Sequence, residues 1–268
     1  MEKIKVIAEI GENHIGDMEI ARRLVEEAAQ AGADYVKFQS YRPENFRPDD
    51  PEYEWFKKVS LSDEAHVMLK NRAEELGIKF LSSPFSLERA KFLCEKLGLK
   101  EIKIASGIML NFKILDYIQD RVEAVFLSTG MATLGEIRDA LRHIRKVPNI
   151  YLLHCTTQYP CGDKDANLRA IPVLKNKFPE CKVGYSDHTI GAGACILATA
   201  LGAEVIEKHF TFDKSAEEGT DHILSLDLRE LKELVIQIRR AEDLLGKADK
   251  IPTDSELKIR DFVRGRFI

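Results

Sequence analysis

Eight apolar runs recur along the chain, and a segment with helical periodicity follows most of them. Runs of this length that end in polar residues or glycine are typical of β-strands buried on both faces. We expect strands at residues 5–11, 35–40, 79–85, 101–106, 124–130, 150–156, 182–188 and 205–211. Amphipathic helical patterns lie at residues 18–33, 62–77, 87–98, 133–146 and 228–246.

The boundaries of several helices are also marked. Ser62, followed by Asp63 and Glu64, predicts an N-cap with an acidic first turn. Glycine is a common stop signal after a helix, and it stands at Gly32, Gly77, Gly98 and Gly202.

Eight β-then-α units in 268 residues predict a (β/α)8 TIM barrel, which typically takes about 250 residues. We expect one catalytic domain over residues 1–268. The alternative is a doubly wound sheet, which has the same alternation but usually fewer strands and a glycine-rich first turn.

Polar residues collect at the carboxyl ends of all eight runs, where a TIM barrel has its active site. Such residues are unusual in buried parallel strands. They are Glu9, Asn13 and His14; Lys37 and Gln39; Ser82 and Ser83; Lys103 and Ser106; Ser128 and Thr129; His154, Thr156 and Thr157; Ser186 and His188; and Glu207 and His209.

Residues two apart share one face of a strand, so Ser186 and His188 point the same way, as do Glu207 and His209. Two histidines on neighbouring strands predict a divalent-metal site with positions open for water or substrate. The alternative is that each histidine is a hydrogen-bonded interior residue.

Two lysines, Lys37 and Lys103, point into the same mouth, which is lined with hydroxyl groups. Buried lysines need an anion, and a substrate with a phosphate and a carboxylate would supply one. The alternative is a pair of structural ion pairs with Glu9 or Glu207.

The stretch VGYSDHTIGAG, at residues 183–193, suggests a hydrolase triad or a dinucleotide-binding turn, and we exclude both interpretations. Consecutive residues on an extended chain point to opposite faces, so Ser186, Asp187 and His188 cannot easily form a hydrolase triad. The third glycine of a dinucleotide-binding turn is replaced by Ile196. We expect Ser186 and His188 to face the mouth and Asp187 to point away.

The composition limits the possible partners and the cellular location of the protein. The net charge is -4 and no basic block is present, which argues against nucleic acid. No N-terminal segment is long and apolar enough for a signal peptide or a membrane helix. The five cysteines lack a C-x-x-C pair and are expected in the core of a reduced, cytoplasmic protein; they are Cys94, Cys155, Cys161, Cys181 and Cys195.

Several ordered motifs resemble the N-acetylneuraminate (sialic acid) synthase family. They are AEIGENHIGD, VKFQ, FLSSPF, KIASG, LSTGM, LHCTTQYP, VGYSDHTIG and EKHFT. The resemblance implies a TIM barrel that condenses phosphoenolpyruvate with an N-acylated hexosamine, giving a nonulosonic acid and phosphate. It also implies a divalent metal, Mn²⁺ or Mg²⁺, and a homo-oligomer, a dimer.

Carried over by motif, the resemblance assigns His188 and His209 to the metal and Glu9, Lys37 and Glu207 to catalysis. Gln39, Tyr159 and Asp221 would contact the sugar. The phosphoenolpyruvate site would comprise Lys37, Ser83, Lys103, Ser106, Ser128, Thr157 and Ser186.

The sequence departs from the family in four places. Thr157 replaces an asparagine of some members, and Thr220 replaces a commoner proline beside Asp221. The segment RPENFRPDDPEYEW, residues 42–55, is shorter than usual. The antifreeze-like domain that usually follows the barrel, with an arginine for the partner's sugar site, is expected to be absent after residue 268, and the alternatives are that it is truncated or supplied by another chain.

Two other functions fit the same residues. An aldolase acting on a keto acid would use a barrel-mouth lysine as a Schiff base or a metal ion. A barrel that binds a sugar phosphate without turnover would use the same anion site.

Overall fold

The computed structural model describes residues 3–216 and 221–267. Its eight strands are parallel, in the order β3-β2-β1-β8-β7-β6-β5-β4. β3 lies beside β4, but no ladder of hydrogen bonds joins these two strands in the described chain. The strands are β1 (Lys5–Gly11), β2 (Tyr35–Ser40), β3 (Lys79–Pro84), β4 (Glu101–Ile104), β5 (Ala124–Ser128), β6 (Asn149–His154), β7 (Lys182–Asp187) and β8 (Val205–His209).

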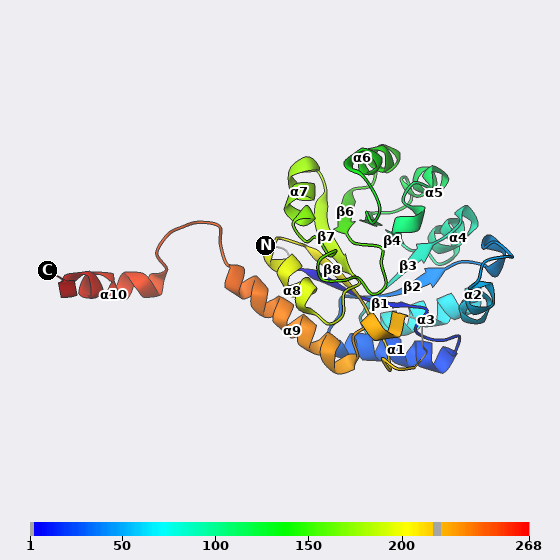
Figure 1. The fold of residues 1–268 in the computed structure, drawn as a ribbon, viewed down its shortest axis with the longest axis horizontal. Coiled ribbons are helices and arrows are strands. Elements are labelled where there is room, and N and C mark those ends of the chain that lie inside the picture. Colours follow the sequence, from blue (N-terminus) through cyan, green and yellow to red (C-terminus); the bar gives the residue numbers. More distant parts are fainter. Residues whose placement is uncertain (1–2, 217–220, 268) are drawn as a thin grey trace.

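Helices alternate with the strands and surround them, which confirms the predicted (β/α)8 TIM barrel (Figure 1). The α-helices are α1 (Met18–Ala31), α2 (Tyr53–Val59), α3 (Asp63–Glu75), α4 (Leu87–Lys91), α5 (Phe112–Ile118), α6 (Leu134–His143), α7 (Ala170–Lys177), α8 (Gly193–Ala200), α9 (Leu228–Leu245) and α10 (Asp254–Arg264). The short helical turns are η1 (Pro43–Asn45), η2 (Phe92–Lys96), η3 (Ser106–Ile108), η4 (Asp221–Leu224) and η5 (Gly265–Phe267).

Local signals explain several boundaries. The Ser62 side chain accepts a hydrogen bond from the Ala65 amide at the start of α3, as predicted. Gly32 ends α1 with a φ of 85°, a left-handed conformation that glycine adopts without strain, and Gly77, Gly98 and Gly202 also have positive φ.

Several predicted strands were too long at their carboxyl ends, because the last residues leave the ladder. Ser106, for example, lies in η3, and His188 follows β7. The predicted helix at residues 87–98 changes after α4 into a π-helical turn, η2. No residue range was predicted for α2, α5, α7, α8 or α10, and Figure 1 shows α10 set apart from the barrel beyond α9.

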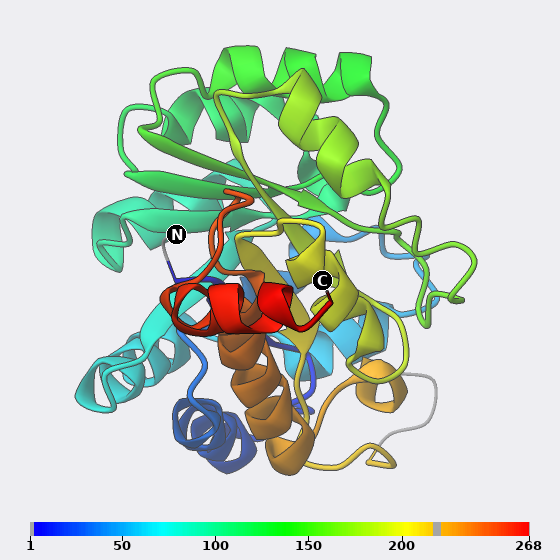
Figure 2. The same ribbon diagram turned by 90° about the vertical axis from the view of Figure 1, so that its left-hand side faces the viewer.

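In the view from the side of α10, this helix lies in front, and the other helices lie around the strands behind it (Figure 2). In the described chain, no helix combines the length and the apolar character needed to cross a membrane.

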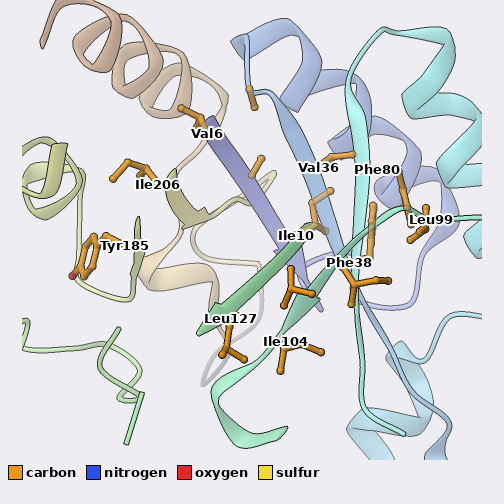
Figure 3. Packing of buried hydrophobic residues seen from close by; sticks show 14 of the residues in the cluster. Val6, Ile10, Val36, Phe38, Phe80, Leu99, Ile104, Leu127, Tyr185 and Ile206 are labelled. Atoms are coloured by element: carbon orange, nitrogen blue, oxygen red, sulfur yellow. The ribbon is translucent and has the colours of Figure 1, made fainter. Parts of the chain in front are cut away.

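Alternate residues of each strand serve different cores. Val6, Val36, Phe38 and Phe80 belong to the large cluster between barrel and helices, part of which Figure 3 shows. A smaller cluster fills the barrel interior and comprises Ile7, Tyr35, Leu81, Ala124, Phe126, Tyr151, Leu153 and Val205. Continuing along the inward face, Glu9 follows Ile7 and Glu207 follows Val205, so polar residues form the next layer of the interior.

Gly184 in β7 has no room for a side chain. A Cβ atom there would lie 2.5 Å from Leu153 Cδ2 and 2.6 Å from the Val205 carbonyl oxygen. We expect Gly184→Ala to lower the free energy of unfolding by about 1–3 kcal/mol, because backbone on the next strand cannot move cheaply. Urea denaturation measures this loss.

The matched control is Gly193→Ala at the start of α8, where nothing lies within 4 Å of the added atom. Equal urea midpoints for the two variants would contradict the steric argument.

Candidate active site

A cavity of about 720 Å³ opens at the carboxyl ends of the strands. Every predicted site residue except Ser83 lines it: Glu9, Lys37, Gln39, Lys103, Ser106, Ser128, Thr157, Tyr159, Ser186, His188, Glu207, His209 and Asp221. Ser83 lies behind this surface, and its hydroxyl accepts a 3.4 Å hydrogen bond from Lys37 Nζ.

The inner end of the cavity holds two lysines and two carboxylates. Lys37 Nζ lies 2.5 Å from Glu9 Oε2, and Lys103 Nζ lies 3.2 Å from Glu207 Oε1. Lys37 also lies 3.8 Å from Glu207, so the four side chains form one connected group. The ion pairs considered from the sequence are therefore present. Their position on the cavity surface leaves the lysines accessible to an anionic ligand.

The two carboxylates have different environments. Burial raises the pKa of Glu9 to about 7, although Lys37 opposes the shift. Burial would also raise the pKa of Glu207, but Lys103, Lys37 and the Ser186 hydroxyl outweigh it and lower the pKa to about 2. Ser186 donates a 2.8 Å hydrogen bond to Glu207. The two lysines thus favour the anion of Glu207, whereas burial favours the protonated form of Glu9.

A set of hydroxyl groups, from Ser106, Ser128 and Thr157, lines the same cavity as Lys103. The Ser128 hydroxyl is buried and has no hydrogen-bond partner among the described residues. The Gly130 amide donates to Ser106 Oγ at 3.1 Å. A Cβ atom on Gly130 would collide with Thr157 Oγ1 and lie 2.7 Å from Ser106 Oγ, so this glycine keeps the space open. Hydroxyls that line a cavity together with a lysine are suited to bind phosphate oxygens.

His188 and His209 face each other, with ring centroids 5.5 Å apart. His188 donates from Nδ1 to the Thr156 carbonyl oxygen at 2.7 Å, which leaves Nε2 as the acceptor nitrogen. Burial lowers the pKa of both histidines, so both are neutral. His209 Nδ1 has no hydrogen-bond partner in the described chain and lies 3.4 Å from Asp221.

His188 fits a metal ligand, because it is a neutral ring whose second nitrogen is fixed by a hydrogen bond, and the facing His209 is a neutral ring with an unpartnered nitrogen. No cluster of three histidine, cysteine or acidic residues suited to a metal ion occurs in the described ranges. Other coordination positions would therefore belong to water or substrate.

Asp187 faces away from the cavity, as predicted. It is fully buried between β7 and its helices, where it pairs with Lys208 at 2.8 Å and accepts hydrogen bonds from the Tyr185 hydroxyl and the Thr189 amide. Because side chains alternate along the extended chain, Asp187 points away from the cavity, whereas Ser186 and His188 face it.

The cavity also contains residues that the sequence did not single out: Glu12, Phe46, Glu52, Trp55, Phe56, Phe85, Ala105, Gly107 and Cys155, together with Asn13, which was noted only as polar. Cys155 is buried, as expected, but it lines the cavity and contacts Ser106 Oγ at 3.1 Å. Its inward phase on β6, two residues beyond Leu153, was the available signal. Cys94 is only half-buried, so the expectation of a core residue was wrong there.

Six of the polar strand-end residues lie outside the cavity lining: His14, Ser82, Ser83, Thr129, His154 and Thr156. His154, for example, bonds to the Ala166 carbonyl oxygen at 2.9 Å. Thr220 lies outside the described residues.

The NeuB family model matches residues 24–250 of the chain. This chain belongs to the NeuB family. The N,N'-diacetyllegionaminic acid synthase of Campylobacter jejuni is 43% identical over 98% of this chain and 84% of its own length. The enzyme of the same name from Legionella pneumophila is 41% identical over 97% of this chain and 78% of its own length.

A solved structure of this NeuB-family fold is also similar. The N-acetylneuraminic acid synthetase of Leptospira borgpetersenii, in complex with citrate, has a TM-score of 0.93 and 36% identity, covering 99% of this chain and 93% of that one. The predicted family and the prediction of an enzyme are confirmed.

Proposed function

We propose that this NeuB-family protein condenses phosphoenolpyruvate with the open-chain aldehyde of an N-acylated amino sugar. The products are a nonulosonic acid and inorganic phosphate. One observation carries the proposal: a single cavity combines two buried lysines, a set of hydroxyls and two facing neutral histidines. Its size is typical of small-molecule sites.

Phosphoenolpyruvate would bind at the inner end. Lys103, Ser106, Ser128 and Thr157 line the same cavity, and this group would hold the phosphate. Lys37, on the other side of Glu207, would hold the carboxylate, with Ser83 and Ser186 supporting the two lysine–glutamate pairs. Binding redirects each lysine from a protein carboxylate to a substrate anion, so its charge stays compensated.

His188 and His209 would hold Mn²⁺ or Mg²⁺, which acts as a Lewis acid on the aldehyde oxygen. Tyr159 lies against His188, with ring centroids 4.1 Å apart, and Asp221 lies beside His209. These two residues and Gln39 would orient the sugar over the inner end of the cavity.

The reaction forms a bond between carbon 3 of phosphoenolpyruvate and the aldehyde carbon, and the aldehyde oxygen takes a proton. Water then adds at carbon 2, and phosphate leaves with its bridging oxygen, so the oxygen of water becomes the keto oxygen. Glu207 would balance the positive charge that develops at carbon 2. Glu9 suits the proton transfer better than Glu207, because burial raises the pKa of Glu9, whereas Lys103, Lys37 and the Ser186 hydroxyl keep Glu207 an anion.

The bridging oxygen gives a direct prediction. Phosphoenolpyruvate labelled with ¹⁸O at that atom should deliver the label to inorganic phosphate, as measured by mass spectrometry. Retention of the label in the sugar product would contradict the proposed bond cleavage. Incubation without sugar is the control and should release no phosphate.

Borohydride trapping and phosphate release together separate the alternatives. A Schiff-base aldolase would be trapped on a lysine by borohydride in the presence of the keto acid, whereas the proposed synthase would not. A binding protein without turnover would release no phosphate with any sugar. We also propose that the protein forms a dimer and is located in the cytoplasm.

A further inference from the structure

Cys155 lies among the groups that would bind phosphate, but the proposed function gives its thiol no role. The side chain is buried and lines the cavity. A Cβ atom on Gly130 would lie 2.9 Å from Cys155 Sγ and 2.7 Å from Ser106 Oγ, and it would collide with Thr157 Oγ1. These three side-chain atoms therefore converge beside Gly130.

The Ser106 hydroxyl is the centre of a small hydrogen-bond network. The Gly130 amide donates to Ser106 Oγ at 3.1 Å, and Cys155 Sγ lies 3.1 Å from the same oxygen. The thiol makes no other hydrogen bond with the described residues. A hydroxyl has one hydrogen and can accept two bonds. Either the thiol donates to Ser106, or Ser106 donates to the sulfur.

The thiol is the better donor of the two when an anion is bound. If Ser106 gave its hydrogen to the sulfur, which is a weak acceptor, it would present only lone pairs to the ligand. If Cys155 donates, Ser106 Oγ accepts two hydrogen bonds and keeps its own hydrogen for the ligand. The bonds then run in one direction, from thiol to hydroxyl to anion, and each strengthens the next.

Two further observations indicate that an anion binds here. The Ser128 hydroxyl lines the same cavity, is only 2% exposed, and has no hydrogen-bond partner among the described residues. A buried hydroxyl of this kind needs a ligand as its partner. In addition, burial lowers the pKa of Lys103 while Glu207 and Cys155 oppose that shift, so the thiol lies within electrostatic reach of this lysine.

We propose that Cys155 is a positioning residue for the phosphate group of phosphoenolpyruvate. Its thiol donates to Ser106 Oγ and thereby directs the Ser106 hydroxyl hydrogen toward a phosphate oxygen. This inference rests on the proposed function, which assigns Ser106 to the phosphate. Because Cys155 acts through Ser106, its loss should weaken binding of phosphate and leave binding of the sugar unchanged.

The first test compares Cys155→Ala with Cys155→Ser in the full chain, with Mn²⁺ and N-acetylmannosamine as the acceptor. Cys155→Ala should raise the KM for phosphoenolpyruvate about 10-fold, with kcat and the KM for the sugar unchanged. Calorimetric titration with inorganic phosphate should show the same loss of affinity. Cys155→Ser keeps a donor at this position and should restore most of the affinity.

Two other variants separate hydrogen bonding from packing. Cys155→Val fills the space without a donor and should bind phosphate as weakly as Cys155→Ala. Cys181→Ala removes another buried thiol, which does not line the cavity, and should leave phosphate binding unchanged. Normal phosphate affinity of the valine variant would show that Cys155 only fills space, and would overturn the proposal.

A double-mutant cycle tests the route of the effect. Ser106→Ala should itself weaken phosphate binding, and adding Cys155→Ala to this variant should cause no further loss, because the thiol acts through Ser106. A full additional loss in the double variant would show that Cys155 acts independently of Ser106 and would also overturn the proposal.

Failure of this inference can be distinguished from failure of the proposed function. If the original protein releases no phosphate from phosphoenolpyruvate with N-acetylmannosamine or a 2,4-diacetamido-2,4,6-trideoxyhexose, the proposed function is wrong. The titrations with inorganic phosphate still decide the role of Cys155 in that case. If the original protein is active and Cys155→Ala binds phosphate normally, this inference alone is wrong.

Discussion

Replacing His188 or His209 by alanine is expected to abolish condensation while the barrel remains folded. Both imidazoles are neutral and face each other across the cavity, and His209 Nδ1 has no hydrogen-bond partner in the described chain. Loss of a Lewis acid removes several kcal/mol of transition-state stabilisation, so the rate should fall at least about 10²-fold. Phosphate release measures the rate, and equilibrium dialysis with Mn²⁺ measures metal binding.

The control is His143→Ala, which removes a histidine paired with Asp116 on the surface. It should leave Mn²⁺ binding and rate unchanged. Undiminished activity of the original protein after exhaustive chelation would contradict the prediction, as would normal Mn²⁺ binding by both cavity variants.

The largest effect on stability is expected for Asp187→Ala. Asp187 and Lys208 are both fully buried, so the substitution leaves an ammonium group without its counter-charge. It also removes the acceptor of hydrogen bonds from Tyr185 and Thr189. Removing one partner of a buried pair costs about 3–5 kcal/mol. Thermal and urea unfolding measure the loss.

Two comparisons make this prediction specific. Asp139→Ala breaks an exposed pair with Arg142 and should cost less than about 1 kcal/mol. The double variant Asp187→Leu with Lys208→Met removes both charges and should recover much of the loss. A midpoint for Asp187→Ala equal to that of Asp139→Ala would mean that the buried pair does not stabilise the barrel.

The fold and the inner end of the site were predictable because their signals are local. Strand spacing predicted the barrel, and alternation predicted that Ser186 faces the cavity while Asp187 does not. Lys37 and Gln39 were placed on one face for the same reason.

The part of the cavity lined by residues 42–55 was not predictable, because it depends on how this loop folds against the loop after β1. Glu12 joins the site through bonds from Tyr41 and Trp55, which are far from it in sequence. Residues 42–55 have no periodic pattern that would place Phe46 or Trp55 in the cavity. The opposite pKa shifts of Glu9 and Glu207 likewise depend on contacts across the barrel, because Glu9 pairs with Lys37, whereas Glu207 lies near both Lys103 and Lys37 and accepts from Ser186.

The absence of a hydrogen-bonded ladder between β3 and β4 in the described chain has a consequence for local opening of the barrel. Amide hydrogens on strands paired on both sides, such as β1 and β8, should exchange with solvent water later than those of β4, which is paired on one side only. Lys37 on β2 and Lys103 on β4 stand on either side of this gap. An anion bound by both lysines would therefore link the two sides of the gap and slow the amide hydrogen exchange of β4.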